Sequence, residues 1–242
     1  MNDVLDMHMH TIVSGHAYST LSEMVAAGKH KKLQLIGITE HAPALPGTCH
    51  DMYFRNFKVI NRHPGNIELM MGAEVNIMDY DGNLDMREDT LQRLDYGIAS
   101  FHEQCIKPGS KEENTAALLN AIKNPYIKII GHPDNGAYPV DFDVIAKTAS
   151  QNNVLLELNN SSYSPRSGRI NSRENGRLML SFCKKYNTSV ILDSDAHIAD
   201  DVGNHKYIYD LLVQIDFPEK LIVNTDVDKL KHIFSASREQ SL

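Results

Sequence analysis

Short β-rich runs alternate with helix-like stretches along this chain of 242 residues. The β-rich runs lie near residues 3–7, 34–39, 67–75, 95–101, 127–131, 154–159 and 189–194, and the clearest helices are expected at 21–32, 111–123, 141–152 and 173–186. Thr20, Ser110 and Asp141 are suitable capping residues near three of the expected helix starts. This alternation predicts an α/β fold in which crossover helices join parallel strands.

Polar residues stand at the ends of these runs, and their position favours one α/β architecture over another. Seven repeats are compatible with a closed barrel and with an open, doubly wound sheet. In a barrel, functional side chains collect at the C-terminal ends of several strands. The candidates that stand there are His8 and His10, His41, Glu74, His102, His132, and Asp195 with His197. We therefore expect a barrel with its site at those strand ends.

Composition and charge narrow the functional classes. With 42% hydrophobic residues and no Pro/Gly/Ser-rich stretch dividing it, the chain is expected to form a single domain over residues 1–242. The formal net charge of −7 argues against binding to nucleic acid or to an anionic membrane. No signal peptide or long uncharged apolar segment is apparent, so the expected location is the cytoplasm. Cys49, Cys105 and Cys183 are widely spaced and odd in number, which predicts free thiols.

His8 and His10 form a motif of two imidazoles separated by one residue. On a strand, positions i and i+2 share a face, so both rings could reach one metal ion. Asp6 would share that face and could accept a hydrogen bond from a free ring N–H group. Alone, the motif is equally compatible with two surface histidines. The histidines and carboxylates at later strand ends favour a metal site.

Seven segments of the chain, taken in order, resemble the PHP (polymerase and histidinol phosphatase) family. These segments are DMHMHT, ITEH, GAEVN, SFHE, GHPDN, LELNNSS and DSDAH, with His16 six residues after His10. The resemblance extends over essentially the whole length and is greatest to the small stand-alone phosphatases of the YcdX type. It implies a distorted seven-stranded (β/α)7 barrel that holds three divalent metal ions, usually zinc, in one cleft.

The resemblance also implies how the ligands are distributed. His8, His10, Glu74 and Asp195 would surround the first ion, Glu74 would bridge to a second ion held by His102 and His132, and His16, His41 and His197 would hold the third. Seven imidazoles and two carboxylates without a thiolate suit zinc, manganese or iron. They suit calcium and magnesium less well, because those ions prefer oxygen ligands.

Such a site predicts a hydrolase that acts on phosphate esters. A bridging carboxylate holds two cations about 3.5–4 Å apart, as in two-metal hydrolases. The expected nucleophile is a metal-bridging hydroxide that attacks phosphorus in line, so no side-chain nucleophile is needed. Glu74, Asp195 and His197 are the candidate catalytic residues. Asp195, or water on the third metal, is a candidate proton donor to the leaving group.

Substrate contacts are expected from the segment that follows the sixth β-rich run. Neutral donors there are Asn159, Asn160, Ser161 and Ser162, and Arg166, Arg169 and Arg173 could close over the phosphoryl group. Of these, Asn159, Asn160 and Arg166 are the expected substrate-binding residues. The expected partner is a small phosphorylated substrate, and a homo-oligomer is compatible with the sequence.

One position departs from the family pattern, and five histidines fall outside it. The family often has Asp before the histidine of its I-T-D-H motif, where this chain has Glu40, which is expected to support the ligands with a longer reach. The five remaining histidines lie in helix-like or loop segments and are expected at the solvated surface: His30, His50, His63, His205 and His232.

Two other functional classes remain open. One is a different metal-dependent hydrolase, either a histidinol-phosphate phosphatase or a 3′–5′ exonuclease, and the charge of −7 stands against the exonuclease. The other is a non-enzymatic metal-binding or regulatory protein. The presence of every expected ligand stands against this second class.

Overall fold

Seven parallel strands form a nearly closed barrel in the computed structural model, which describes residues 2–239. Residues 1 and 240–242 of the expected domain lie outside the described residues. The strands are β1 (Leu5–Asp6), β2 (Leu35–His41), β3 (Glu68–Asn76), β4 (Gly97–Ser100), β5 (Ile127–Ile130), β6 (Leu155–Asn159) and β7 (Val190–Asp193). They pair in chain order, each parallel to the next. The predicted parallel α/β barrel is therefore confirmed.

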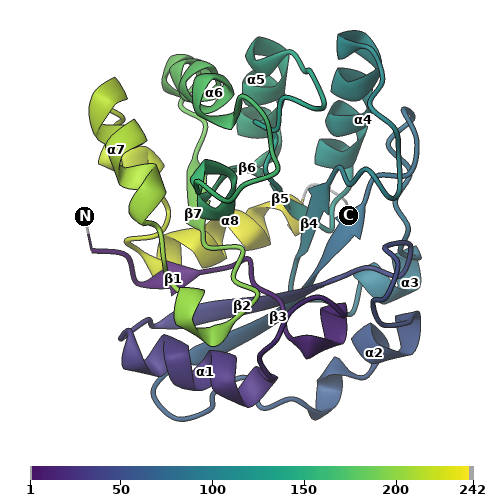
Figure 1. The fold of residues 1–242 in the computed structure, drawn as a ribbon, viewed down its shortest axis with the longest axis vertical. Coiled ribbons are helices and arrows are strands. Elements are labelled where there is room, and N and C mark those ends of the chain that lie inside the picture. The colour runs from purple at the N-terminus through teal and green to yellow at the C-terminus, as the bar shows by residue number, and fades with distance from the viewer. Residues whose placement is uncertain (1, 240–242) are drawn as a thin grey trace.

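Helices cover the outside of the barrel, except that the last helix lies across one end of it (Figure 1). They are α1 (Leu21–His30), α2 (Asp51–Arg55), α3 (Glu88–Leu91), α4 (Lys111–Lys123), α5 (Phe142–Asn152), α6 (Ser172–Tyr186), α7 (Lys206–Ile215) and α8 (Val227–Glu239). The four expected helices correspond to α1, α4, α5 and α6. Thr20 and Ser110 begin α1 and α4 with capping boxes, in which the cap and the third helical residue satisfy each other's backbone N–H groups.

The remaining helices were not among those expected. In α7, the buried residues Ile208, Leu211 and Leu212 follow the helical spacing i, i+3, i+4, although aromatic and β-branched residues dilute the pattern. In the part of the chain that the structure describes, no helix is both long and apolar enough to cross a membrane. Cys49, Cys105 and Cys183 are free, as predicted.

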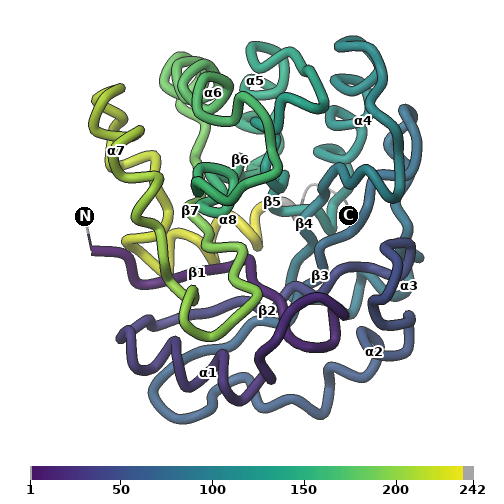
Figure 2. The backbone as a smooth tube through the Cα atoms, in the orientation of Figure 1, coloured from purple at the N-terminus to yellow at the C-terminus, as the bar shows by residue number. Residues whose placement is uncertain are grey.

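The barrel closes where its first and last strands meet (Figure 2). Near the C-terminal ends, the backbone N–H groups of His10 and Asp195 donate across this seam at 2.8 and 2.9 Å. Nearer the N-terminal ends, the Asn224 side chain bridges the two strands. Its Nδ2 donates hydrogen bonds to the carbonyl oxygens of Leu5 (3.2 Å) and Leu192 (2.6 Å). The seam therefore joins the segment after β1 directly to the segment after β7.

One apolar residue from each strand points into the part of the barrel interior that lies nearer the N-terminal ends of the strands. These residues are Leu5, Leu35, Met70, Ile98, Ile129, Leu155 and Ile191. Leu230 and Phe234 of α8 pack against them and close that end. Because side chains alternate along a strand, the residues two or four positions further on point to the same interior. Glu74 and Glu157 occupy such positions. The polar site therefore lies next to this layer of apolar side chains, on the side of the C-terminal strand ends, and we call the layer the apolar floor.

The prediction of a solvated surface is wrong for one of the five remaining histidines. His30, His50, His63 and His232 are exposed, but His205 is buried. His205 Nδ1 lies 2.8 Å from Asp3 Oδ2, and its Nε2 lies 3.9 Å from Asp6 Oδ1. Burial alone would lower the pKa of His205, but hydrogen bonds to Asp3 and Asp6 outweigh burial and raise the pKa to about 9.

We predict that His205→Ala lowers the free energy of unfolding by about 3–5 kcal/mol at pH 7, because the buried carboxylate of Asp6 would lose its cation. The His205 pKa rises on folding from 6.5 to about 9, so its contribution is complete below pH 6.5 and is lost as the pH rises through about 9. Urea denaturation across that range measures both effects. The control His63→Ala, at an exposed position, should change stability by less than about 0.5 kcal/mol. Equal stability of the two variants would contradict the buried pair.

Candidate metal centre

The C-terminal ends of the strands bring together all nine side chains that the sequence singled out as ligands. His8, His10 and His16 follow β1, His41 ends β2, Glu74 lies in β3, His102 follows β4, His132 follows β5, and Asp195 and His197 follow β7. Three overlapping groups have ligand atoms within 4.8 Å of one another: His10, His41 and His197; His8, His10 and Glu74; and His41, Glu74 and His102.

Glu74 lies at the centre of this cluster, and its two carboxylate oxygens face different sets of imidazoles. Its Oε2 lies 2.7 Å from His41 Nδ1, 3.4 Å from His8 Nε2 and 3.6 Å from His10 Nε2, whereas its Oε1 lies 3.0 Å from His132 Nε2 and 3.3 Å from His102 Nε2. The Glu74 side chain is 1% exposed. This arrangement is the one required of a carboxylate that bridges two cations.

Asp195 joins the other side of the cluster to the loop after β6. Its Oδ1 lies 3.3 Å from His10 Nε2, 3.7 Å from His8 Nε2 and 3.6 Å from His197 Nδ1. Its Oδ2 accepts hydrogen bonds from Arg169 Nη2 at 3.0 Å and Asn159 Nδ2 at 3.1 Å. The backbone of Asp195 has φ +55°, a left-handed conformation that side chains rarely adopt. Such strain is concentrated at functional sites.

The outer part of the cluster is formed by stacked imidazoles. His16 Nε2 lies 3.0 Å from His197 Nε2. The His41 ring stacks on His10 at 4.1 Å between centroids and on His16 at 4.9 Å. His10, His16, His41 and His197 thus form one contiguous group next to Glu74 and Asp195.

The donor set fits divalent metal ions. Glu74 Oε2 and both ring nitrogens of His41 are buried without a hydrogen-bond partner in good geometry, although Oε2 and Nδ1 lie 2.7 Å apart. Buried polar atoms normally have such partners, so these atoms call for another electron-pair acceptor. Two donors about 2.1 Å from one ion in a tetrahedral shell lie about 3.4 Å apart. This separation falls within the range of 2.7 to 3.7 Å between the facing donor atoms here. Nitrogen and carboxylate donors without thiolate suit zinc, manganese or iron.

Glu157 is a buried carboxylate that orients two of these histidines, and the sequence reasoning did not single it out. Its Oε1 lies 2.6 Å from His8 Nδ1, and its Oε2 accepts a hydrogen bond from the backbone N–H of His132 at 2.6 Å. The bond to Nδ1 leaves His8 Nε2 to face Glu74. An acidic residue within the otherwise apolar run VLLEL was the signal available in the sequence.

The prediction that Asp6 supports His8 or His10 is wrong. Asp6 instead accepts hydrogen bonds from Ser194 Oγ (2.5 Å), Ser194 N (3.1 Å) and Gly203 N (2.7 Å). The regular strand ends at Asp6, and Met7 is held by other elements: its N–H donates to Asp193 Oδ1 at 2.7 Å, and its carbonyl accepts from Tyr96 Oη at 2.5 Å. The strict alternation that would place Asp6 beside the histidines is therefore lost.

Glu40 does support the ligands, through a serine hydroxyl. Ser14 Oγ donates to Glu40 Oε2 at 2.6 Å and lies 3.3 Å from His10 Nδ1. The same hydroxyl accepts the backbone N–H of His41 at 3.0 Å. Thr11 Oγ1 donates to the other carboxylate oxygen of Glu40, Oε1, at 2.5 Å. The longer side chain of Glu40 thus acts on His10 across one intervening hydroxyl.

Neighbouring charges hold the two candidate carboxylate ligands in their ionised form. Burial would raise the pKa of Glu74, but the surrounding imidazoles, His102 foremost, lower that pKa well below its ordinary value. Burial would also raise the pKa of Asp195, but His8, His10 and Arg169 lower it well below its ordinary value. Ionised carboxylates are the form that binds divalent cations.

Burial keeps most of the inner imidazoles neutral. It lowers the pKa of His10 well below its ordinary value, lowers that of His41 to about 4, and lowers that of His132. His8 differs, because burial would lower its pKa but the negative charge of Glu157 and its neighbours raises it well above the ordinary value. A metal ion must displace the proton on His8, so metal uptake becomes less favourable in acid.

The residues expected to bind substrate fall into two groups. Asn159 makes four hydrogen bonds, to Glu157, Asp195, Ser162 and Arg169, which is the number that an amide side chain can make. Arg169 Nη2 donates to Asp195 Oδ2, so Asn159 and Arg169 are both engaged by other residues of the site. By contrast, Asn160, Ser161 and Arg166 line a polar pocket beside Asp195, and Arg173 lies over the Tyr163 ring at 6.0 Å.

Comparison with known proteins agrees with this arrangement. A family model described as PHP domain matches residues 6–161, which include seven of the nine candidate ligands. The chain is 46% identical to a probable phosphatase of Clostridium novyi (strain NT), with 95% of this chain and 93% of that protein covered. It is 44% identical to a probable phosphatase of Caldicellulosiruptor saccharolyticus, with 93% and 92% covered.

A solved structure shares the fold. It is a histidinol phosphate phosphatase from Lactococcus lactis in complex with zinc, L-histidinol and phosphate. The two structures superpose with a TM-score of 0.63 at 18% sequence identity, covering 89% of this chain and 95% of the other. The family match over most of the barrel and the similarity to relatives over nearly the full length show that this chain belongs to the PHP domain family.

Proposed function

We propose that residues 1–242 form one phosphatase domain that hydrolyses small phosphomonoesters with three divalent metal ions. Zinc is the proposed metal, with manganese or iron as alternatives. His8, His10, Glu74 and Asp195 would hold the first ion, Glu74, His102 and His132 the second, and His16, His41 and His197 the third. The relatives that are named probable phosphatases support the reaction class.

The observation that carries this proposal is the position of Glu74. Five imidazoles surround the buried carboxylate of Glu74, which is more than one carboxylate needs for its hydrogen bonds. Two cations that share one carboxylate need such an arrangement. When bound, such ions supply a deprotonated water at neutral pH and offset the charge that develops on the phosphoryl oxygens.

The protein's own contribution is to fix the ligands in one geometry and one protonation state. Glu157 holds His8 and the backbone of His132, and Arg169 with Asn159 holds Asp195. We propose that Asn159 and Arg169 position Asp195, because their polar atoms are engaged there. The low pKa of Asp195 favours an ionised ligand over a proton donor to the leaving group.

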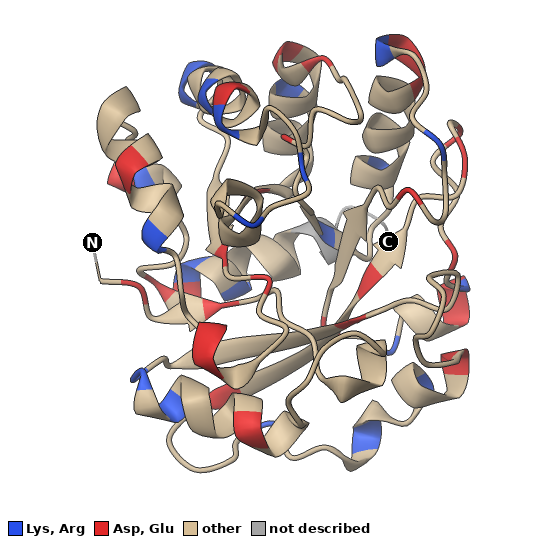
Figure 3. Cartoon of the chain, in the orientation of Figure 1, with Lys and Arg blue, Asp and Glu red and all other residues tan. Residues whose placement is uncertain are grey.

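The alternatives differ in their substrates. The fold shared with a histidinol phosphate phosphatase keeps histidinol phosphate as a second candidate. An exonuclease requires a surface that attracts the phosphate backbone of DNA. Figure 3 shows basic residues dispersed over the outer helices and mixed with acidic ones, which does not favour that role.

We expect purified protein to contain two to three zinc, manganese or iron atoms per chain and to hydrolyse p-nitrophenyl phosphate. Elemental analysis measures the metal, and parallel assays with histidinol phosphate and a single-stranded DNA oligomer compare the alternatives. Exhaustive chelation should abolish the activity, and zinc should restore it. An active, well-folded preparation without metal would refute the proposal.

We predict that Glu74→Gln lowers kcat/KM for p-nitrophenyl phosphate by about 100-fold or more, because it removes one anionic oxygen shared by two cations. His16→Ala, which alters only the outer group, should cost about tenfold. Metal content should fall in both variants, while far-UV circular dichroism stays unchanged because the apolar floor is intact. Near wild-type turnover and full metal content in Glu74→Gln would exclude the bridging role.

We predict that Glu157→Gln weakens zinc binding by about 10–100-fold, because it replaces a charged partner of His8 with a neutral one of the same size. Competition with a chromophoric chelator at pH 7.5 measures the affinity. Glu112→Gln, at an exposed position on α4, removes the same charge outside the site and should leave zinc affinity unchanged. Equal affinities in the two variants would show that Glu157 does not position the ligands.

A further inference from the structure

A polar pocket of about 540 Å³ opens beside the metal centre and shares Asp195 with it. Its walls come from the loop after β6, the segment after β7 and the first turn of α7. Its polar lining residues include Asn160, Arg166, Asp201, Asn204 and Lys206. A volume of this size fits a small molecule. Because the pocket begins at a candidate metal ligand, its occupant would be the part of the substrate next to the phosphoryl group.

Two cations line this pocket without a carboxylate partner. Among the described side chains of residues 2–236, neither the Arg166 guanidinium nor the Lys206 ammonium group forms an ion pair. Lys206 Nζ lies 4.6 Å from the centre of the Tyr207 ring. Arg169, on the same loop, already forms an ion pair with Asp195, in which Nη2 lies 3.0 Å from Oδ2. Arg166 and Lys206 are therefore the cations available for a ligand.

The start of α7 adds to the positive potential of the pocket. Lys206 is the first residue of this ten-residue helix, whose N-terminal end carries a partial positive charge. Asn160 Oδ1 accepts the backbone N–H of Tyr207 at 2.9 Å, so the group that Asn160 can offer to a ligand is its amide N–H₂. A cavity, two unpaired cations, a helix N-terminus and an amide donor thus converge on one volume.

One anionic wall residue limits the kind of ligand. Asp201 also lines the pocket and accepts a hydrogen bond from Asn204 Nδ2 at 3.2 Å. Its charge disfavours a bare polyanion but suits a ligand that also offers a hydroxyl donor. Bidentate contacts from an arginine suit a carboxylate or a phosphate group.

We propose that this pocket binds the leaving group of the substrate and that Arg166 and Lys206 hold a second acidic group on it. The substrate is then a phosphomonoester of a small hydroxylated molecule with a carboxylate or a further phosphate. This inference rests on the proposed phosphatase function. It assigns Arg166 to the leaving group, while the phosphoryl group itself lies at the metal centre.

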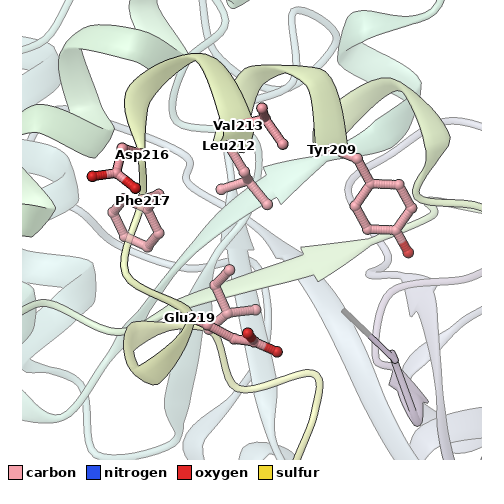
Figure 4. Close-up of a pocket in the computed structure, with 7 residues that line it drawn as sticks. Tyr209, Leu212, Val213, Asp216, Phe217 and Glu219 are labelled. Atoms are coloured by element: carbon pink, nitrogen blue, oxygen red, sulfur yellow. The ribbon is translucent and has the colours of Figure 1, made fainter.

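A second groove is lined by residues of α7 and of the segment that follows it, and it is more apolar. Figure 4 shows Leu212 and Val213 between the rings of Tyr209 and Phe217. The carboxylates of Asp216 and Glu219 also line the groove. It has no cation among its lining residues and shares none with the metal centre. A phosphorylated acid would therefore bind in the pocket beside Asp195.

The test compares matched substrates in the zinc-loaded protein. 3-Phosphoglycerate and glycerol 3-phosphate differ in a carboxylate, and fructose 1,6-bisphosphate and fructose 1-phosphate differ in a second phosphate. The acidic member of at least one pair should have the higher kcat/KM. Arg166→Gln and Lys206→Gln should each reduce that preference by about tenfold, the equivalent of one charged hydrogen bond. The double variant Lys58→Gln/Lys220→Gln removes two charges from exposed positions and should keep the preference.

The outcomes separate the two proposals. Absence of hydrolysis of every phosphomonoester would refute the phosphatase function, and calorimetric titration with 3-phosphoglycerate would still test the pocket. Hydrolysis without a preference for either acidic substrate would overturn the pocket proposal alone. A preference that persists in the Arg166→Gln/Lys206→Gln double variant would overturn it as well. Loss of the preference in that variant, but not in the surface control, supports it.

Discussion

The contact between Glu74 and five imidazoles is the constraint on which the rest of the site depends. A carboxylate that is 1% exposed is costly to bury unless cations or donors surround it, and here its two oxygens face two separate sets of ring nitrogens. Each set comes from different strands, so the contact requires the strands to be in register at their C-terminal ends. The parallel pairing of β2 with β3 places His41 directly beside Glu74, and the pairing of β3 with β4 carries His102 to the other oxygen.

The seam between β1 and β7 has the second decisive role, because it brings the two ends of the sequence together. Hydrogen bonds from His10 N and Asp195 N cross it, so His8 and His10 meet Asp195 although about 190 residues of sequence separate them. Behind these ligands, buried polar side chains fix each ring: Glu157 holds His8, and Ser14 with Glu40 holds His10. The candidate metal centre is thus supported by residues of β2 and β6, the strands that flank the seam on either side.

Much of the fold and of the candidate site could be predicted from the sequence, and the exceptions have physical causes. The alternation of β-rich and helical runs predicted parallel strands joined by helices, since runs such as IKIIG and VLLEL carry that signal locally. The polar residues at the strand ends then favoured a barrel over an open sheet. The error at Asp6 arose because the strand stops there, and Met7 is held by Asp193 and Tyr96, which lie 186 and 89 residues away. The error at His205 has a similar origin, because its partner Asp3 is distant in sequence.

The sequence by itself determined which residue types stand at the ends of the strands, and therefore the nitrogen and carboxylate donor set and the expectation of a metal centre. These properties are local, because strand period and strand ends are encoded in short runs. Only the tertiary structure decided which oxygen of Glu74 faces which imidazole, that Glu157 holds His8, that Asn159 and Arg169 are committed to Asp195, and that Arg166 and Lys206 share a pocket. Those relations depend on barrel closure, and closure is a property of all seven strands together.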